Sequence, residues 1–326
     1  MIYKKVDKID IEFSAMGYGC WGAAGSSYWT GHKDDEQIKA MHAAMDGGIN
    51  LFDVAPVYGL GHAEKILGKA MKGRRGKAII ASKCGLIWDA QGNVVNDCSR
   101  KSIMNQIEQS LKRLDTDYID IYQVHWPSDN GIPIDETMEA LNKLKEQGKI
   151  RYIGLSNFGV ELSKEAMKHG EISSMQGLYN IIERNEQAYH NIKLTYKTED
   201  EILPLVEKEG MAFFPYSPLL QGFLTGEFKS RNNFNINDVR VNNPKLSGDA
   251  FTTIFKMVNE LKSVAEEIGK PLYELALKWL MEKRQVTSII AGVKDANQVS
   301  ANLKSVEWEI PNSVKIKINE IVRLRN

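Results

Sequence analysis

The chain has 326 residues, of which 43% are hydrophobic, so it can bury a core large enough for two ordinary domains or for one barrel-sized domain. Its 42 basic and 42 acidic residues give a formal net charge of zero, which argues against nucleic acid or an anionic membrane surface as a partner. The cysteines, Cys20, Cys84 and Cys98, are too few and too scattered for a disulfide framework or a zinc site. The scarcity of cysteines implies no metal. With no leader-like N-terminus and no apolar run long enough to span a bilayer, we expect a soluble cytoplasmic protein.

Strands and helices are predicted to alternate along the chain. Residues 1–14 are expected to form a hairpin, and the repeating pattern starts after it. Asp34 and Asp35 are candidate caps of a helix that ends at Gly47, and Ser99 is a candidate cap of a later helix. Short apolar runs between the helical stripes indicate strands. The predicted strands are 15–20, 50–53, 77–83, 118–124, 151–155, 173–176, 211–215 and 286–291.

This regular alternation predicts parallel strands with right-handed crossovers, because a tight turn cannot connect parallel neighbours. Eight such units favour a (β/α)8 barrel, with the hairpin covering its bottom and extra helices at the C-terminal end. A doubly wound open sheet is the alternative, but the glycines at 17, 19 and 22 are followed by no helix start. No linker divides the chain, so residues 1–326 are expected to form a single domain. Residues 231–243, which follow the seventh strand, are expected to form a loop at the active site.

Polar residues occur repeatedly where the predicted strands end. In an eight-stranded barrel these ends meet on one face, where the βα loops build the active site. Asp53, Tyr58, Lys83 and His125 are ionisable residues that follow or end such apolar runs, so together they could form a proton-transfer site. The other polar or small residues at strand ends are Ser156, Asn157, Gln176, Ser217 and Gly292.

Several of these stretches together resemble an aldo-keto reductase over nearly the whole chain. They are Asp53-Val54-Ala55-Pro56-Val57-Tyr58-Gly59, Ser82-Lys83, Tyr122-Gln123-Val124-His125-Trp126, Gly154-Leu155-Ser156-Asn157-Phe158, Tyr216-Ser217-Pro218-Leu219, and Gly292-Val293-Lys294 continuing through Gln298 to Asn302. Within that superfamily the chain resembles the bacterial branch that contains inositol-operon reductases and, more distantly, the potassium-channel β subunits. The resemblance implies NAD(P)H-dependent, reversible reduction of an aldehyde, ketone or sugar carbonyl.

Carbonyl reduction needs a hydride at carbon and a proton at oxygen, so the site needs a cofactor and a general acid. Tyr58 can supply the proton, and the ammonium of Lys83 is expected to lower the pKa of Tyr58. Asp53 can pair with Lys83, and His125 can orient the carbonyl oxygen by a hydrogen bond. The resemblance assigns the same four roles to these residues. Taken singly, each also has a structural interpretation as a cap, a loop residue or a core histidine.

The resemblance also implies a set of cofactor-binding residues. Lys294 is a candidate for binding the 2′-phosphate of NADP(H), which we expect to be preferred. Asp295 leaves NAD(H) open, since a carboxylate repels a phosphate and can accept a hydrogen bond from a ribose hydroxyl. The implied cofactor residues are Ser156, Asn157 and Gln176 for the carboxamide, Tyr216 for the nicotinamide ring, Ser217, Leu219 and Gly222 for the pyrophosphate, and Gly292, Lys294, Gln298 and Asn302 for the adenosine half.

The substrate is less well specified by the sequence. Trp21, Trp88 and Trp126 follow strand ends and could wall a pocket for a small carbonyl compound or a sugar. Two other functions stay open: a cofactor-binding regulatory subunit with slow redox chemistry, and a barrel isomerase or lyase that uses no nicotinamide. No helix face marks an interface between subunits, so the sequence does not decide whether the protein forms a homo-oligomer.

Overall fold

The computed structural model describes residues 1–25, 33–228 and 243–323. Its centre is an eight-stranded parallel sheet in the order β13-β10-β9-β8-β5-β4-β3-β14. The two edge strands, β13 and β14, are linked by a hydrogen bond: the amide of Thr287, just before β14, donates to the carbonyl of Phe213 on β13 at 2.9 Å. The strands are β3 (Met16–Gly19), β4 (Leu51–Asp53), β5 (Ile79–Cys84), β8 (Ile119–Val124), β9 (Ile150–Ser156), β10 (Ser174–Leu178), β13 (Ala212–Tyr216) and β14 (Ile289–Gly292).

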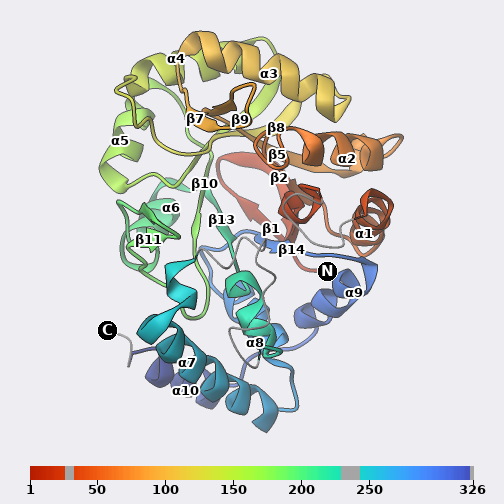
Figure 1. Ribbon diagram of the computed structural model, residues 1–326, viewed down its shortest axis with the longest axis vertical. Coiled ribbons are helices and arrows are strands. Elements are labelled where there is room, and N and C mark those ends of the chain that lie inside the picture. Colours follow the sequence, from red (N-terminus) through yellow and green to blue (C-terminus); the bar gives the residue numbers. More distant parts are fainter. Residues whose placement is uncertain (26–32, 229–242, 324–326) are drawn as a thin grey trace.

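Helices surround this sheet as a ring, which Figure 1 shows in a view along the barrel. The predicted (β/α)8 barrel is therefore confirmed. The α-helices are α1 (Asp34–Asp46), α2 (His62–Met71), α3 (Arg100–Leu114), α4 (Ile134–Glu146), α5 (Val160–His169), α6 (Leu203–Glu209), α7 (Gly248–Glu267), α8 (Leu272–Met281), α9 (Ala296–Leu303) and α10 (Asn312–Arg323). Shorter helical turns are η1 (Cys20–Ala23), η2 (Arg75–Lys77), η3 (Thr198–Ile202), η4 (Leu220–Thr225), η7 (Pro244–Leu246) and η8 (Lys304–Val306).

The capping predictions have different outcomes. Ser99 does cap α3, since its hydroxyl accepts a hydrogen bond from the amide of Ser102 at 3.3 Å. The prediction for the first helix was wrong: Lys33 is the N-cap, and Asp34 and Asp35 lie in the first turn. Acidic residues at this place still stabilise the helix, because they face the positive end of its dipole.

The strands separate two hydrophobic cores, because successive side chains of a strand point to opposite faces. In β5, Ile80 belongs to the large core between the barrel and its helices, whereas Ile79 and Ala81 belong to the smaller core inside the barrel. Lys83 continues the inward-facing series two residues after Ala81. The barrel interior is therefore apolar at the start of the strands and carries a charge near their ends.

The N-terminal hairpin closes the bottom of the barrel, as the sequence predicted. It consists of β1 (Tyr3–Val6) and β2 (Ile9–Ser14), paired antiparallel. Ile9 and Phe13 belong to the core inside the barrel, and the ring of Phe13 lies 5.4 Å from that of Phe214 on β13. This hairpin excludes water from one end of the barrel and leaves the other end for chemistry.

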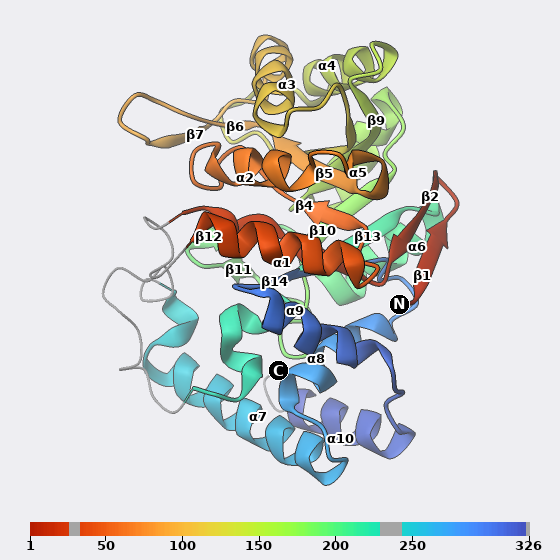
Figure 2. The ribbon, with the colours of Figure 1, turned by 90° about the vertical axis from the view of Figure 1, so that its right-hand side faces the viewer.

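Two further hairpins, which the sequence did not reveal, lie at the opposite end of the barrel (Figure 2). They are β6 (Leu86–Trp88) with β7 (Val94–Asn96), and β11 (Ala188–Tyr189) with β12 (Ile192–Lys193). Each is inserted between a barrel strand and its helix, so each extends a βα loop over the face where the strands end.

The C-terminal part adds helices outside the regular pattern, as predicted. Helices α7 and α10 lie side by side at one edge of the ring in both views (Figures 1 and 2). The predicted active-site loop at 231–243 lies outside the described residues apart from Asn243. Within the described ranges, each helix is too short or too polar to cross a membrane.

Candidate active site

Four ionisable residues meet where the barrel strands end, as the sequence predicted. Asp53 ends β4, Lys83 lies near the end of β5, His125 follows β8, and Tyr58 lies in the turn after β4. The Lys83 ammonium is 2.8 Å from both carboxylate oxygens of Asp53 and donates to the carbonyl of Val54 at 3.1 Å. It also donates to the Tyr58 hydroxyl at 3.4 Å. The Tyr58 and His125 rings lie 6.0 Å apart, edge to face.

The Asp53–Lys83 ion pair is buried. The side chain of Lys83 is 0% exposed and that of Asp53 is 3% exposed. Gln176 adds a third contact, because its Nε2 donates to Oδ1 of Asp53 at 2.9 Å. A buried charge of this kind persists only if it is paired and hydrogen-bonded, so the ion pair fixes the ammonium opposite Tyr58.

The expected lowering of the Tyr58 pKa is wrong for this structure. Burial of the hydroxyl raises the pKa of Tyr58 well above 10, and the negative charge of Asp53 adds to that rise. The ring itself is only half-buried. The ammonium of Lys83 does not outweigh these effects, since it is bound closely to Asp53 and lies farther from the phenol. Tyr58 is therefore held in the protonated form, which is the form a proton donor needs.

His125 is held in the opposite state. Burial lowers the pKa of His125 well below 6.5, and the nearby charge of Lys83 lowers it further. Its backbone amide donates to the carbonyl of Cys84 at 2.9 Å, whereas its Nδ1 has no partner among the described residues. A neutral imidazole can donate one hydrogen bond to a carbonyl oxygen without bringing a second positive charge beside Lys83.

This depressed pKa predicts a pH dependence of stability. An unfolded histidine binds a proton below about pH 6.5, whereas folded His125 stays neutral, so folding should weaken as the pH falls. We expect the loss attributable to His125 to approach about 1.4 kcal/mol per pH unit below about pH 6. Urea unfolding of the wild type and of His125→Asn between pH 7.5 and 5 measures it. Equal pH dependences in the two proteins would contradict the neutral assignment.

Asn157 connects several predicted site residues. Its Nδ2 donates to the carbonyl of His125 at 3.0 Å and to the hydroxyl of Ser156 at 3.1 Å. Its Oδ1 accepts from the hydroxyls of Tyr216 at 2.8 Å and Tyr196 at 3.0 Å. The ring of Tyr216 is thus tethered on the same face as His125. Tyr196 comes from the loop after β10, and no sequence pattern indicated it.

The predicted pyrophosphate residues lie on the irregular loop after β13. Ser217 and Leu220 have positive φ angles of 54° and 48°, and Gly222 has φ of 95°. The carbonyl of Ser217 accepts from Nδ2 of Asn180 at 3.1 Å, and the amide of Gly222 donates to the carbonyl of Leu219 at 2.9 Å. A non-glycine residue with positive φ is uncommon, so this loop is held in shape by its surroundings.

The predicted adenosine residues lie at the end of β14 and on α9. Asp295 is the N-cap of α9, and its Oδ1 accepts from the amide of Gln298 at 2.9 Å. Oε1 of Gln298 in turn accepts from the amide of Lys294 at 2.9 Å, and Nε2 of Gln37 donates to the carbonyl of Lys294 at 2.7 Å. The side chain of Lys294 is exposed. Gly292 is also exposed, and Asn302 is buried on α9.

The three tryptophans that were predicted to line the substrate pocket lie in different surroundings. The ring of Trp21 is 4.9 Å from that of Tyr58 in an edge-to-face arrangement, which places it beside the reacting groups. Trp126 follows His125 directly and is half-buried. Trp88 lies on β6, where the guanidinium of Arg113 is 5.7 Å from its ring. A role for these tryptophans in substrate binding stays a prediction.

Comparisons with known proteins show the family of the chain. Residues 15–323 match the sequence model of the Aldo/keto reductase family. The chain belongs to this family. It is 34% identical over 325 residues to aldo-keto reductase YhdN of Bacillus subtilis (strain 168), covering 99% of this chain and 94% of that protein. It is also 32% identical over 317 residues to the NADH-specific methylglyoxal reductase of Escherichia coli (strain K12), covering 93% of each chain.

A solved structure gives the same result for the fold. The glycerol dehydrogenase AKR11B4 from Gluconobacter oxydans superposes with a TM-score of 0.86 and 33% sequence identity. The match covers 98% of this chain and 94% of that one. The protein is accordingly an aldo-keto reductase by family and an oxidoreductase by class, which confirms the resemblance that its sequence motifs indicated.

Some residues around this aldo-keto reductase site had no sequence signal. Glu64 is a fully buried carboxylate on α2, and Arg113 on α3 pairs with it. Gln37 and Asn180 support the two loops described above. Each lies on a helix or in a loop, where a polar residue is ordinarily read as solvent-facing. Their partners are distant in the chain, so only the fold reveals them.

Proposed function

We propose that this aldo-keto reductase transfers hydride between a nicotinamide dinucleotide and a small carbonyl compound, with Tyr58 as the general acid. The observation that carries the proposal is the arrangement of the Tyr58 hydroxyl 3.4 Å from a Lys83 ammonium that is fixed by Asp53. Membership of the family supports the reaction class. The edge-to-face contact between Tyr58 and His125 supports a shared position for the carbonyl oxygen.

The four residues divide the proton chemistry between them. Tyr58 donates its proton to the carbonyl oxygen, and Lys83 stabilises the phenolate that this step leaves. Asp53 keeps the ammonium in place, and the neutral His125 orients the carbonyl oxygen by a hydrogen bond. The nicotinamide, when bound, supplies the hydride. In the reverse direction the Tyr58 phenolate accepts the proton of the alcohol.

The described residues fit a nicotinamide dinucleotide. Tyr216 has a half-buried ring whose hydroxyl is bonded to Asn157, and Asn157 also donates to the backbone carbonyl of His125. At Gly292 a side chain would meet no atom of the described residues within 4 Å, so these residues leave open space at the end of β14 beside the exposed Lys294. These features support the predicted binding of the nicotinamide by Ser156, Asn157 and Gln176 and of the adenosine half near α9.

A direct assay tests the proposal. Purified protein should oxidise NADPH in the presence of at least one member of a panel of small aldehydes, ketones and sugars, and should reduce NADP with the matching alcohol. A polyol is a reasonable member of that panel, since one structural relative is a glycerol dehydrogenase. Tight NADPH binding without any turnover would favour the regulatory-subunit alternative, and absence of dinucleotide binding would favour an isomerase or lyase.

We further propose that NADPH is preferred over NADH. Lys294 is exposed at the end of β14, where an ammonium can bind a 2′-phosphate. The Asp295 carboxylate is expected to repel a 2′-phosphate less strongly, because it caps α9 and accepts a hydrogen bond from the amide of Gln298. One relative is NADH-specific, so the preference needs measurement.

Lys294→Met tests this preference. We expect KM for NADPH to rise about tenfold, since removing a charged partner of a phosphate costs roughly 1.5 kcal/mol, with KM for NADH unchanged. Steady-state kinetics with both cofactors measures the effect. The matched control is Lys304→Met, which removes a lysine from the far end of α9. A tenfold advantage for NADH in the wild type would refute the preference.

The cytoplasm remains the proposed location. All three cysteines are free and buried, which suits a reducing compartment.

A further inference from the structure

We propose that a buried ion pair outside the active site, between Glu64 and Arg113, positions Tyr58 and Lys83 for proton transfer through Ser82. Glu64, Arg113 and Ser82 would then be positioning residues, since none of them contacts the reacting atoms. The inference rests on the proposed role of Tyr58 as the acid. It concerns what holds that acid at the correct distance from its ammonium partner.

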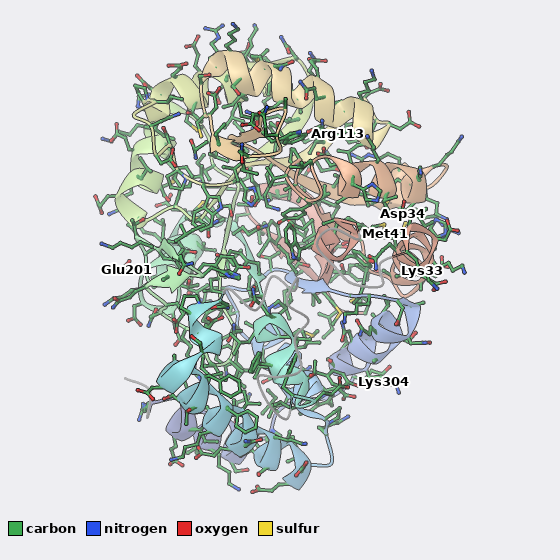
Figure 3. All side chains as sticks on the ribbon, in the orientation of Figure 1. Lys33, Asp34, Met41, Arg113, Glu201 and Lys304 are labelled. Carbon is green, nitrogen blue, oxygen red and sulfur yellow. The ribbon has the colours of Figure 1, made fainter. Side chains whose placement is uncertain are left out.

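The ion pair lies between two helices and a strand, with its carboxylate fully buried and its guanidinium largely buried. Glu64 lies in the first turn of α2 with its carboxylate 0% exposed, and Arg113 lies near the end of α3 with a side chain 12% exposed. Nε of Arg113 donates to Oε2 of Glu64 at 2.6 Å, and the hydroxyl of Ser82 donates to Oε1 at 2.8 Å. Figure 3 shows Arg113 between α3 and α2. Both carboxylate oxygens are therefore occupied, one by each neighbouring element.

One side of this network supports the turn that carries Tyr58. The amide of Ala63, which precedes Glu64, donates to the carbonyl of Tyr58 at 3.1 Å. Gly61 adopts φ of 91°, and a Cβ there would lie 2.6 Å from Cδ of Arg113. The turn thus packs its backbone directly against the arginine stem. Displacement of Arg113 or Glu64 would move the turn and, with it, the phenol.

The other side supports the strand that carries Lys83. Ser82 precedes Lys83 on β5, and consecutive strand residues point to opposite faces. Lys83 therefore points into the barrel while Ser82 points outward to Glu64. The hydrogen bond from Ser82 fixes β5 from outside at the level of the ammonium. The path from Tyr58 through Ala63, Glu64 and Ser82 to Lys83 is a second link between acid and ammonium, besides their direct 3.4 Å contact.

A second buried ion pair at the other end of the barrel provides a matched comparison. Nη2 of Arg75 donates to Oδ2 of Asp120 at 2.7 Å, and the same oxygen accepts from the amide of Ile80 at 2.9 Å. Asp120 is 3% exposed. This pair joins β5 to β8 at the start of both strands, far from the polar ends. It should stabilise the fold in the same way without influencing the distance between Tyr58 and Lys83.

Ser82→Ala is the most direct test, because it removes only the link from Glu64 to β5. We expect kcat to fall about tenfold to a hundredfold while the Kd for NADPH stays unchanged, since small displacements of reacting groups have effects of this size. The apparent pKa of the acid in the pH profile of kcat should move upward, because the ammonium lies farther from the phenol. A crystal structure should show the Tyr58–Lys83 separation above 3.4 Å.

Two control pairs separate positioning from general stability. Ser14→Ala removes a buried hydroxyl at the barrel bottom, one that donates to the carbonyl of Met16, and should leave kcat unchanged. Glu64→Gln and Asp120→Asn should both lower the melting temperature, but only Glu64→Gln should lower kcat and shift its pH profile.

Two results would overturn the inference. One is a Ser82→Ala enzyme with wild-type kcat and an unshifted pH profile. The other is a Ser82→Ala structure in which the Tyr58–Lys83 separation is unchanged. If the wild type reduces no carbonyl compound, the proposed function fails instead, and the crystallographic separation still decides the positioning.

Discussion

Replacing Tyr58 by phenylalanine should lower kcat for carbonyl reduction by about 10²- to 10⁴-fold, the usual contribution of a general acid. The phenol hydroxyl lies 3.4 Å from the Lys83 ammonium and its ring lies edge to face with that of His125, and phenylalanine keeps the ring while removing the proton. The edge-to-face contact with Trp21 should also be kept. Cofactor binding should therefore remain at the wild-type level, as fluorescence titration with NADPH can measure.

A matched tyrosine is available as a control. Tyr152 has a hydroxyl bonded to Asp10 at the bottom of the barrel, so Tyr152→Phe removes an equivalent group away from the site. We expect Tyr152→Phe to keep wild-type kcat. Equal turnover by Tyr58→Phe and the wild type would refute Tyr58 as the acid and leave the hydride-transfer class intact.

The second large effect concerns the buried ion pair itself. Lys83→Met leaves the carboxylate of Asp53 buried without its countercharge, which should destabilise the fold by about 3–5 kcal/mol. It should also remove turnover, since the phenolate loses its stabilising ammonium. Urea unfolding gives the stability, and steady-state assays below the unfolding transition give the activity.

A double variant distinguishes the two effects. In Asp53→Asn/Lys83→Met both charges are gone and the amide can still accept from Gln176, so most of the lost stability should return. Activity should not return, because the ammonium is still absent. A double variant that recovers both properties would show that Lys83 has only a structural role.

Much of the fold followed from patterns that are local in the chain. The strand-helix alternation predicted the barrel, because each amphipathic or apolar segment carries its own periodicity. The ends of the strands could also be recognised in the sequence. Asp53, Lys83 and His125 were therefore correctly placed on the face of the barrel where the strands end. The hairpins β6–β7 and β11–β12 were missed, since short polar strands inside βα loops resemble ordinary loops.

The electrostatics of the site were less predictable. The sequence placed Lys83 near Tyr58 and suggested a lowered pKa for the phenol, whereas burial and Asp53 raise it. Similarly, the sequence did not show that Asp295 caps α9, whereas its effect on the choice of cofactor stays a prediction. In both cases the residue types were right. Burial and hydrogen-bond partners determine the protonation state and the orientation of each side chain. Neither property can be inferred from the spacing of residues in the sequence.

The sequence by itself determined the barrel, the family and the residues that meet at the strand ends, because periodicity and strand-end chemistry are encoded within single segments. Only the tertiary structure decided which group Lys83 binds most closely, how burial shifts the pKa values of Tyr58 and His125, and that Glu64 pairs with Arg113 and with Ser82, the residue before Lys83. These properties arise from contacts between segments far apart in the chain and from the exclusion of water around them. Tyr58 and Lys83 are 25 residues apart, and Glu64 and Arg113 are 49 apart, so packing rather than local pattern sets their distances.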